Sequence, residues 1–451
     1  MAESKLNNHN GERRGWLPHL VRCVACCSLL VLPNAAQAQR TLAITNARLE
    51  TVSKAGVIEN GTVLVQDGKI AAVGKDVKIP VAAQVIDAGG KTLMPGIIDP
   101  YYVVTIGRNV TSSAPRTIVF QGRVFTIGGG STAIATTFAK VADGFEVEDV
   151  NWSAALRSGI TNFHLVTGGY AQSALGELVE SDKALVSLKK PDGLLITTVS
   201  NETRALDVLR KGLKEPSTTP TSTAAPRGPT PEQLAALRAR FGNRIPTTTA
   251  RPTSSSTTST ATKKPESPID KLWSTVREGK SPVFVNVNNA SSILHVDAAA
   301  GEKSKAKIAL IAAGGDVYLN QENLDPKRYS IILPPRIDSK PNSRLRVNVP
   351  AMLTEKKVDF AFSLSLGQSD FRNMQHNPLF SVGMLVRAGL DRDVALKALT
   401  IGPAKLLGME KELGSLEVGK LANLVLFDGD PLGAMSEVDQ VFIRGKSVHG
   451  K

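Results

Sequence analysis

Residues 95–103, PGIIDPYYV, lie where the pattern of this sequence changes. Before them, from residue 41 to residue 93, short alternating apolar runs are separated by turn residues such as Gln66-Asp67-Gly68, which indicates an antiparallel sheet. After them, predicted helices and strands alternate as far as residue 407. Repeated strand-helix units predict a parallel sheet, and over about 310 residues the leading expectation for this α/β chain is a closed (β/α)8 TIM-like barrel. A doubly wound open sheet is the alternative.

The alternating part divides into segments by hydrophobic periodicity. We expect strands at residues 161–166, 193–199, 282–288, 317–319, 329–333 and 358–363. We expect helices at residues 152–157, 269–278, 304–313, 379–388 and 394–407. Pro378 and Asp391 precede the last two helices, and both residue types are favoured at helix starts.

The two ends of the chain show the same pattern of predicted strands and turns. Residues 421–427 and 438–445 show the same strand-and-turn pattern as the N-terminal part. Isolated hairpins are only marginally stable in water, so neither end has enough strands to stand alone. We therefore expect residues 39–94 and 407–451 to form one small β-sandwich beside a barrel made by residues 95–406.

The first 38 residues have the features of an export signal. A basic segment around Arg13-Arg14 precedes an apolar run, and Ala36-Gln37-Ala38 supplies a small-x-small cleavage pattern. The paired arginines resemble a twin-arginine signal. We expect an exported protein, periplasmic or extracellular, with no integral membrane segment after cleavage and no cysteine outside the signal.

The net charge of +13 does not indicate nucleic-acid binding, because the positive charge is not gathered on one helix or aromatic-rich stripe. Part of it lies in residues 214–267, a segment rich in Ser, Thr and Pro. Such a composition buries too little apolar surface to offset the entropy of ordering. We expect a disordered insertion there, and no nucleic-acid partner.

Four motifs support a resemblance to a known family. They are PGIID at residues 95–99, ALTIGPAKLLG at 398–408, GSLEVGKLANLVL at 414–426 and DGDP at 428–431. Together with the split β-module, they resemble the amidohydrolase superfamily, in its imidazolonepropionase-like branch of composite-domain metallo-dependent hydrolases. The resemblance implies a hydrolase of non-peptide C–N bonds. It also implies one or two divalent metals, held by histidines and an aspartate at the strand ends, that activate water.

The positions that match the family's metal ligands carry other residues. The family's first strand ends in HxH, and Tyr101 and Val103 occupy those places. Asn288 and Gln321 match the later histidine ligands, and Ser365 matches the aspartate, although a short slip would place Asp370 there instead. We therefore expect degenerate metal-ligand positions and no metal cofactor.

The histidine count supports this expectation without an alignment. After residue 38 only His164, His295, His376 and His449 remain, and they are not spaced as HxH or HxxxH pairs. The best remaining catalytic candidates are Asp99, His164, Asp370 and His376.

Three functional hypotheses follow. The first is a catalytically silent exported protein that binds a small-molecule ligand in the barrel mouth. The second is an active hydrolase of amides, cyclic amides or dipeptides with a non-standard centre, for which zinc would be the cofactor if a metal is used at all. The third is an envelope scaffold, or a partner subunit of an active paralogue; homo-oligomerisation is a related expectation.

Overall fold

The computed structural model describes the larger part of the chain. The described residues are 41–104, 116–120, 123–127, 139–144, 152–167, 171–178, 186–190, 195–199, 203–214, 268–302, 304–314, 316–340, 342–366 and 378–450. The expected export signal, the expected insertion from residue 215 onward, and the candidates Asp370 and His376 lie outside these ranges.

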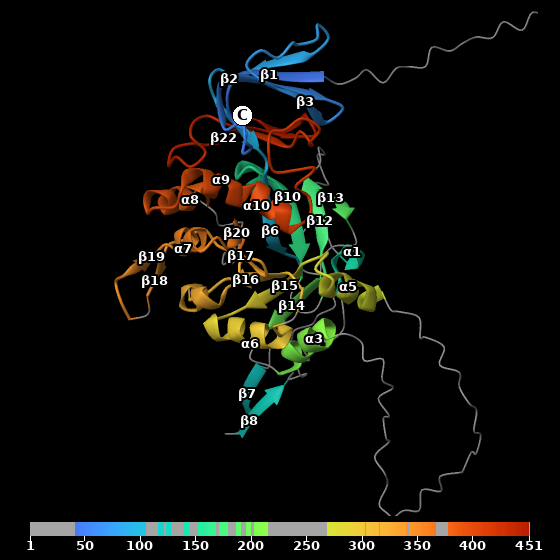
Figure 1. Cartoon of the computed structure of the whole chain (residues 1–451), viewed down its shortest axis with the longest axis vertical. Helices are drawn as coiled ribbons and strands as arrows, with labels where there is room; N and C mark the ends of the chain where they lie inside the picture. Colours follow the sequence, from blue (N-terminus) through green and yellow to red (C-terminus); the bar gives the residue numbers. More distant parts are fainter. Residues whose placement is uncertain are drawn as a thin grey trace, which may run out of the picture. The chain divides into compact units, whose positions relative to one another are not determined.

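Strands from both ends of the chain form one sheet, as the sequence predicts (Figure 1). Its order is β23-β22-β21-β5-β1-β2-β3, with β4 paired to β1. The join is the antiparallel pair of β5 and β21, in which Leu93 lies opposite Leu426. The strands are β1 (Thr41–Glu50), β2 (Val57–Gln66), β3 (Lys69–Gly74), β4 (Gln84–Asp87), β5 (Thr92–Pro95), β21 (Leu424–Phe427), β22 (Val438–Ile443) and β23 (Lys446–Gly450).

Seven parallel strands make the barrel part of the described chain. Strand β6 (Ile97–Val103) pairs with β10 (Ile160–Val166). The other five pair in chain order: β14 (Leu195–Val199), β15 (Val283–Val287), β16 (Ile308–Ala312), β17 (Tyr329–Leu333) and β20 (Asp359–Phe362). The antiparallel strands β12 (Ala174–Leu178) and β13 (Val186–Lys190) extend the first group beyond β10. The short strands β11 (Ala171–Gln172) and β9 (Ala139–Lys140) extend the second group beyond β14.

Helices alternate with the barrel strands, and a few short elements complete the described chain (Figure 1). The helices are α1 (Val141–Gly144), α2 (Trp152–Arg157), α3 (Thr203–Leu213), α5 (Pro268–Arg277), α6 (Ala290–Ala300), α7 (Val349–Glu355), α8 (Pro378–Arg387), α9 (Arg392–Leu399) and α10 (Ile401–Leu406). The 3-10 helix η3 spans Val317–Asn323. The hairpin strands are β7 (Arg116–Phe120) with β8 (Arg123–Ile127), and β18 (Asp338–Ser339) with β19 (Arg346–Val347).

Alternation along the strands separates two layers of the barrel core. In β15, Val283, Val285 and Val287 belong to the large cluster that includes helix residues. Phe284 belongs instead to a cluster with Ile98 and other strand residues of the barrel interior. Successive strand side chains point to opposite faces. Even-numbered residues of β15 therefore face the inside of the barrel.

Three expected segments differ from the structure. Residues 308–312, expected to be helical, form the central strand β16, because a short run that is apolar on every face also suits a strand buried on both sides. Residues 317–319, expected as a strand, lie in the 3-10 helix η3. The helix expected at residues 394–407 is two helices, since Thr400 is non-helical and Pro403 cannot donate a helical hydrogen bond. Helix α6, capped by Asn289, was not expected.

A buried carboxylate joins the β-sheet module to the barrel helices. Glu50, at the end of β1, is 3% exposed. Its Oε1 lies 2.9 Å from a guanidinium nitrogen of Arg392 in α9 and 3.1 Å from one of Arg48. Removing one partner of a buried ion pair leaves a charge that is only partly compensated.

We predict that Arg392→Met lowers the free energy of unfolding by about 2 kcal/mol, and that adding Glu50→Gln recovers a large part of the loss. Urea denaturation of the two single variants and the double variant measures this coupling. Arg210→Met, which removes the exposed pair with Asp207, serves as the control and should change stability by about 0.5 kcal/mol or less. Additive effects of the two substitutions would contradict the prediction.

Candidate functional site

A break in the pairing of β6 with β10 shapes the candidate site. Pro100, inside β6, has no backbone N–H to donate, and the register of β6 on β10 shifts next to it, between the pairs Asp99–Phe163 and Tyr102–Leu165. Ile98 and Tyr101, three residues apart, consequently both belong to the interior cluster. The irregularity directs the Tyr101 side chain into the barrel.

Asp99 is fully buried at this irregularity. Its Oδ1 accepts a hydrogen bond from the backbone N–H of Tyr101 at 3.1 Å. Its Oδ2 accepts one from the backbone N–H of Ser365, just beyond β20, at 3.0 Å. Burial raises the pKa of Asp99 to about 6, although hydrogen bonds from Ser363, Tyr101 and Ser365 act in the opposite direction. Both carboxylate oxygens are therefore engaged by protein groups.

Two serines connect β20 to β6. The hydroxyl groups of Ser363 and Ser365 both donate to the carbonyl oxygen of Tyr101, at 3.1 and 2.6 Å. We call Asp99, Tyr101, Ser363 and Ser365 the β6–β20 cluster. It joins the first and last parallel strands of the described barrel through direct hydrogen bonds.

Tyr101 extends the cluster toward the middle of the barrel. Its hydroxyl group accepts a hydrogen bond from the side-chain amide of Asn286 in β15 at 3.0 Å. The Tyr101 side chain is buried, and burial raises the pKa of its phenol. The phenol is therefore neutral at physiological pH and acts as a hydrogen-bonding group.

His164, in β10, is also buried and fully paired. Its Nδ1–H donates to the carbonyl oxygen of Pro100 at 2.7 Å, and its Nε2 accepts from the hydroxyl of Ser173 at 2.6 Å. The ring packs on Phe284, with 4.7 Å between centroids. Burial lowers the pKa of His164 to about 4, so the ring is neutral at physiological pH.

These residues do not fit a catalytic dication. A zinc centre needs several imidazoles or carboxylates with free lone pairs directed at one point. Each carboxylate oxygen of Asp99 already accepts a backbone hydrogen bond, and the Nε2 lone pair of His164 is directed at the hydroxyl of Ser173. Within the described ranges, no group of three or more His, Cys, Asp or Glu side chains is arranged to hold a metal ion.

The structure brings together some of the predicted site residues and separates others. Tyr101 and Ser365 meet in the β6–β20 cluster, while Val103, at the end of β6, is 56% exposed. Asn288 is exposed one residue beyond β15. Gln321 lies in η3, which corrects the expectation that it follows a strand. Asp370 and His376 lie outside the described residues.

Sequence reasoning missed three polar residues of the site. Asn286 could have been found, because the alternation VFVNV places it on the face opposite to the three valines. Ser363, directly after the strand DFAF, carried a similar but weaker signal. Nothing in the sequence around Ser173 indicates that it pairs with His164.

Comparison with known proteins supports the fold and the family. Residues 295–448 match the model of the amidohydrolase family. Over 418 residues the chain is 25% identical to an imidazolonepropionase of Geobacillus sp. (strain WCH70), covering 88% of this chain and 91% of that one. It is 32% identical to a dihydroorotase of Mycobacterium tuberculosis over 157 residues, 33% of this chain and 35% of the relative. A solved amidohydrolase from Thermotoga maritima superposes with a TM-score of 0.62 at 20% identity, covering 91% of this chain and all of that one.

The chain therefore belongs to the amidohydrolase superfamily. Its fold class is the predicted one, a TIM-like barrel with a β-sandwich built from both chain ends. This is the fold and family of hydrolases that act on amide-type bonds.

Asp99 and His164 should give opposite pH dependences of stability. The raised pKa of Asp99 contributes stability that is present below about pH 4 and is lost as the pH rises through about 6. The lowered pKa of His164 contributes stability that is present above about pH 6.5 and is lost as the pH falls through about 4. Between about pH 4 and pH 6.5, the contribution of Asp99 to stability decreases with rising pH while that of His164 increases.

We predict that Asp99→Asn removes the first contribution. The stability of this variant, measured relative to the parent, should then increase by up to about 3 kcal/mol between pH 4 and pH 6.5. Urea denaturation at several pH values measures the difference. A difference that does not change with pH would show that Asp99 titrates near its ordinary pKa.

Proposed function

We propose that this chain is a catalytically silent member of its superfamily that binds a small polar molecule at the barrel mouth. The observation that carries the proposal is the engagement of Asp99 and His164. Both carboxylate oxygens of Asp99 and both ring nitrogens of His164 are hydrogen-bonded to protein groups. His164 therefore has no free ring nitrogen for a metal or for water activation, and both oxygens of Asp99 are engaged by backbone donors.

The chemistry of amide hydrolysis supports this proposal. Water attacks a neutral amide readily only when a metal lowers the pKa of the bound water to about 7 or a general base accepts its proton. His164 is a poor base, because burial lowers the pKa of its ring to about 4. Asp99 has a pKa closer to neutrality, which favours the alternative of a metal-free hydrolase. However, its side chain is 0% exposed, so substrate cannot reach it in this conformation.

The mouth offers neutral hydrogen-bonding groups to a ligand. Asn288 is exposed there, and Asn286 and Ser365 are half-buried. Amide and hydroxyl groups donate and accept hydrogen bonds without a charge. These groups suit a small polar compound that contains an amide group. Active members of the family hydrolyse compounds of this type.

Export, and a role beside an active paralogue or as a homo-oligomer, remain part of the proposal. They rest on the signal pattern of residues 1–38 and on the missing ligands. None of the described helices is long and apolar enough to cross a membrane.

We predict that the purified mature protein contains substoichiometric zinc, iron and manganese. We also predict no turnover of cyclic amides, hydantoins or dipeptides, with or without added zinc. Elemental analysis and a hydrolysis assay test both points, and an active family member purified in the same way is the control. Stoichiometric metal together with turnover would overturn the proposal, while turnover that resists chelators would support the metal-free hydrolase.

We predict that the double substitution Tyr101→His and Val103→His creates no zinc-dependent turnover, because the later ligand positions are also changed. The variant should lose about 1 kcal/mol of stability, since the hydrogen bond from Asn286 to the Tyr101 hydroxyl disappears. Val103→His alone, at an exposed position, is the matched control and should leave stability nearly unchanged. Zinc-dependent hydrolysis by the double variant would show that a usable ligand set survives.

A further inference from the structure

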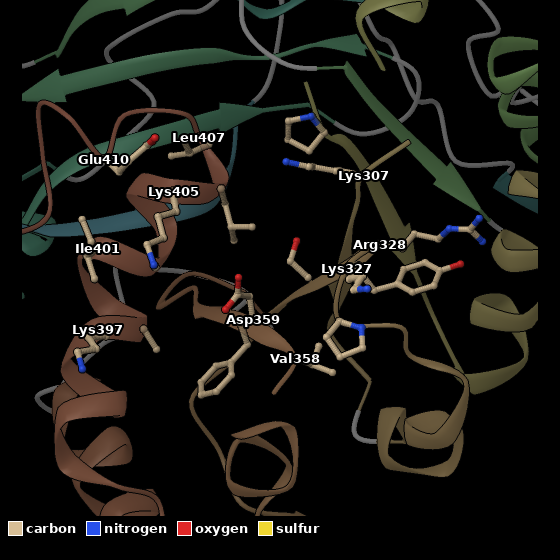
Figure 2. Close-up of a pocket in the computed structure, with 18 of the residues that line it drawn as sticks. Lys307, Lys327, Arg328, Val358, Asp359, Lys397, Ile401, Lys405, Leu407 and Glu410 are labelled. Carbon is tan, nitrogen blue, oxygen red and sulfur yellow. The ribbon is translucent and has the colours of Figure 1, made fainter. Parts of the chain in front are cut away.

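A cavity lies at the end of the barrel strands opposite to the β6–β20 cluster. Its volume is about 840 Å³, and we call it the basal pocket (Figure 2). Residues just before, or at the start of, β15, β16, β17 and β20 line it, together with residues of α9 and α10. The β6–β20 cluster stands at the other ends of the strands, so the basal pocket is separate from the candidate site.

The basal pocket is strongly cationic. Seven cationic side chains line it and only two carboxylates do, those of Asp359 and Glu410. The cationic residues are Lys280, Lys307, Lys327, Arg328, Lys357, Lys397 and Lys405. Oε2 of Glu410 is buried and has no hydrogen-bond partner among the described residues, so this oxygen is not hydrogen-bonded to any of the lysines.

Five of these cations have no anionic partner among the described residues. Lys280 pairs with Glu278 at 2.6 Å, and Arg328 pairs with Asp297 at 3.2 Å. In the part of the chain that the structure describes, no ion pair involves the ammonium groups of the other five, Lys307, Lys327, Lys357, Lys397 and Lys405. All five are exposed, so they can reorient toward a ligand.

The lysines surround a walled space and do not form a flat patch. Lys307 and Lys405 come from opposite sides of the pocket, with Asp359 between them (Figure 2). Pro282, Pro326 and Leu407 contribute apolar wall. Low-dielectric walls lined by one sign of charge concentrate the electrostatic potential.

We propose that the basal pocket binds a small polyanion that carries several phosphate groups. Small-molecule sites commonly have volumes of about 300–1,000 Å³, and the pocket lies in that range. Its available cations are lysines, which are flexible point charges suited to clustered phosphate oxygens. Its single arginine is held by Asp297 and by three backbone carbonyl groups, so no bidentate guanidinium is free to select a planar carboxylate. The proposal is independent of the function proposed for the barrel mouth.

Calorimetric titration of the purified protein with tripolyphosphate tests the proposal. We expect tripolyphosphate to bind saturably, with one site per chain. Pyrophosphate should bind more weakly than tripolyphosphate, and inorganic phosphate more weakly still. Citrate should also bind more weakly than tripolyphosphate. The triple variant Lys307→Gln, Lys397→Gln, Lys405→Gln should bind tripolyphosphate at least about tenfold more weakly.

The matched control is the triple variant Lys75→Gln, Lys78→Gln, Lys211→Gln. It removes the same net charge at exposed positions outside the basal pocket. It should bind tripolyphosphate as the parent does. If both triple variants bind tripolyphosphate equally weakly, the attraction is unspecific and the proposal is overturned. The absence of saturable tripolyphosphate binding to the parent protein would also overturn it. Citrate binding as tight as that of tripolyphosphate would overturn the assignment to phosphate.

Discussion

The carbonyl oxygen of Tyr101 accepts hydrogen bonds from Ser363 and Ser365, and this contact joins β6 to β20. The backbone N–H of Ser365 then reaches the carboxylate of Asp99, which is fully buried. These bonds include Tyr101 and Ser365, the positions where the resemblance to the family places a histidine ligand and the aspartate. Direct hydrogen bonds therefore join the ends of these two strands.

Burial explains the electrostatics of the mouth. Burial raises the pKa of Asp99 and lowers that of His164, although hydrogen bonds to both side chains act in the opposite direction. The His164 ring is therefore neutral at physiological pH, and neutral groups such as the Tyr101 hydroxyl and the Asn286 amide contribute hydrogen bonds to the interior. Charge is instead abundant at the base of the barrel, where the lysines of the basal pocket gather. The two ends of the strands thus offer very different ligand chemistry.

Much of the fold could be predicted from the sequence, because hydrophobic periodicity and turn residues report local structure. The pairing of both chain ends followed from the need of short strands for partners. The segment 308–312 was misassigned, since a run that is apolar on every face does not distinguish a strand from a buried helix. Within the site, Tyr101 was visible as a departure from a motif. The pairing of Ser173 with His164 was not, because it depends on strand contacts that no local pattern encodes.

Thermal unfolding of the purified protein with and without a chelator tests the central claim most directly. If hydrogen bonds alone join β6 to β20, the melting temperature should be the same in EDTA, in buffer and after addition of stoichiometric zinc. A melting temperature that falls in EDTA and recovers with one equivalent of zinc would contradict the account, because a bound ion would then be stabilising the folded state.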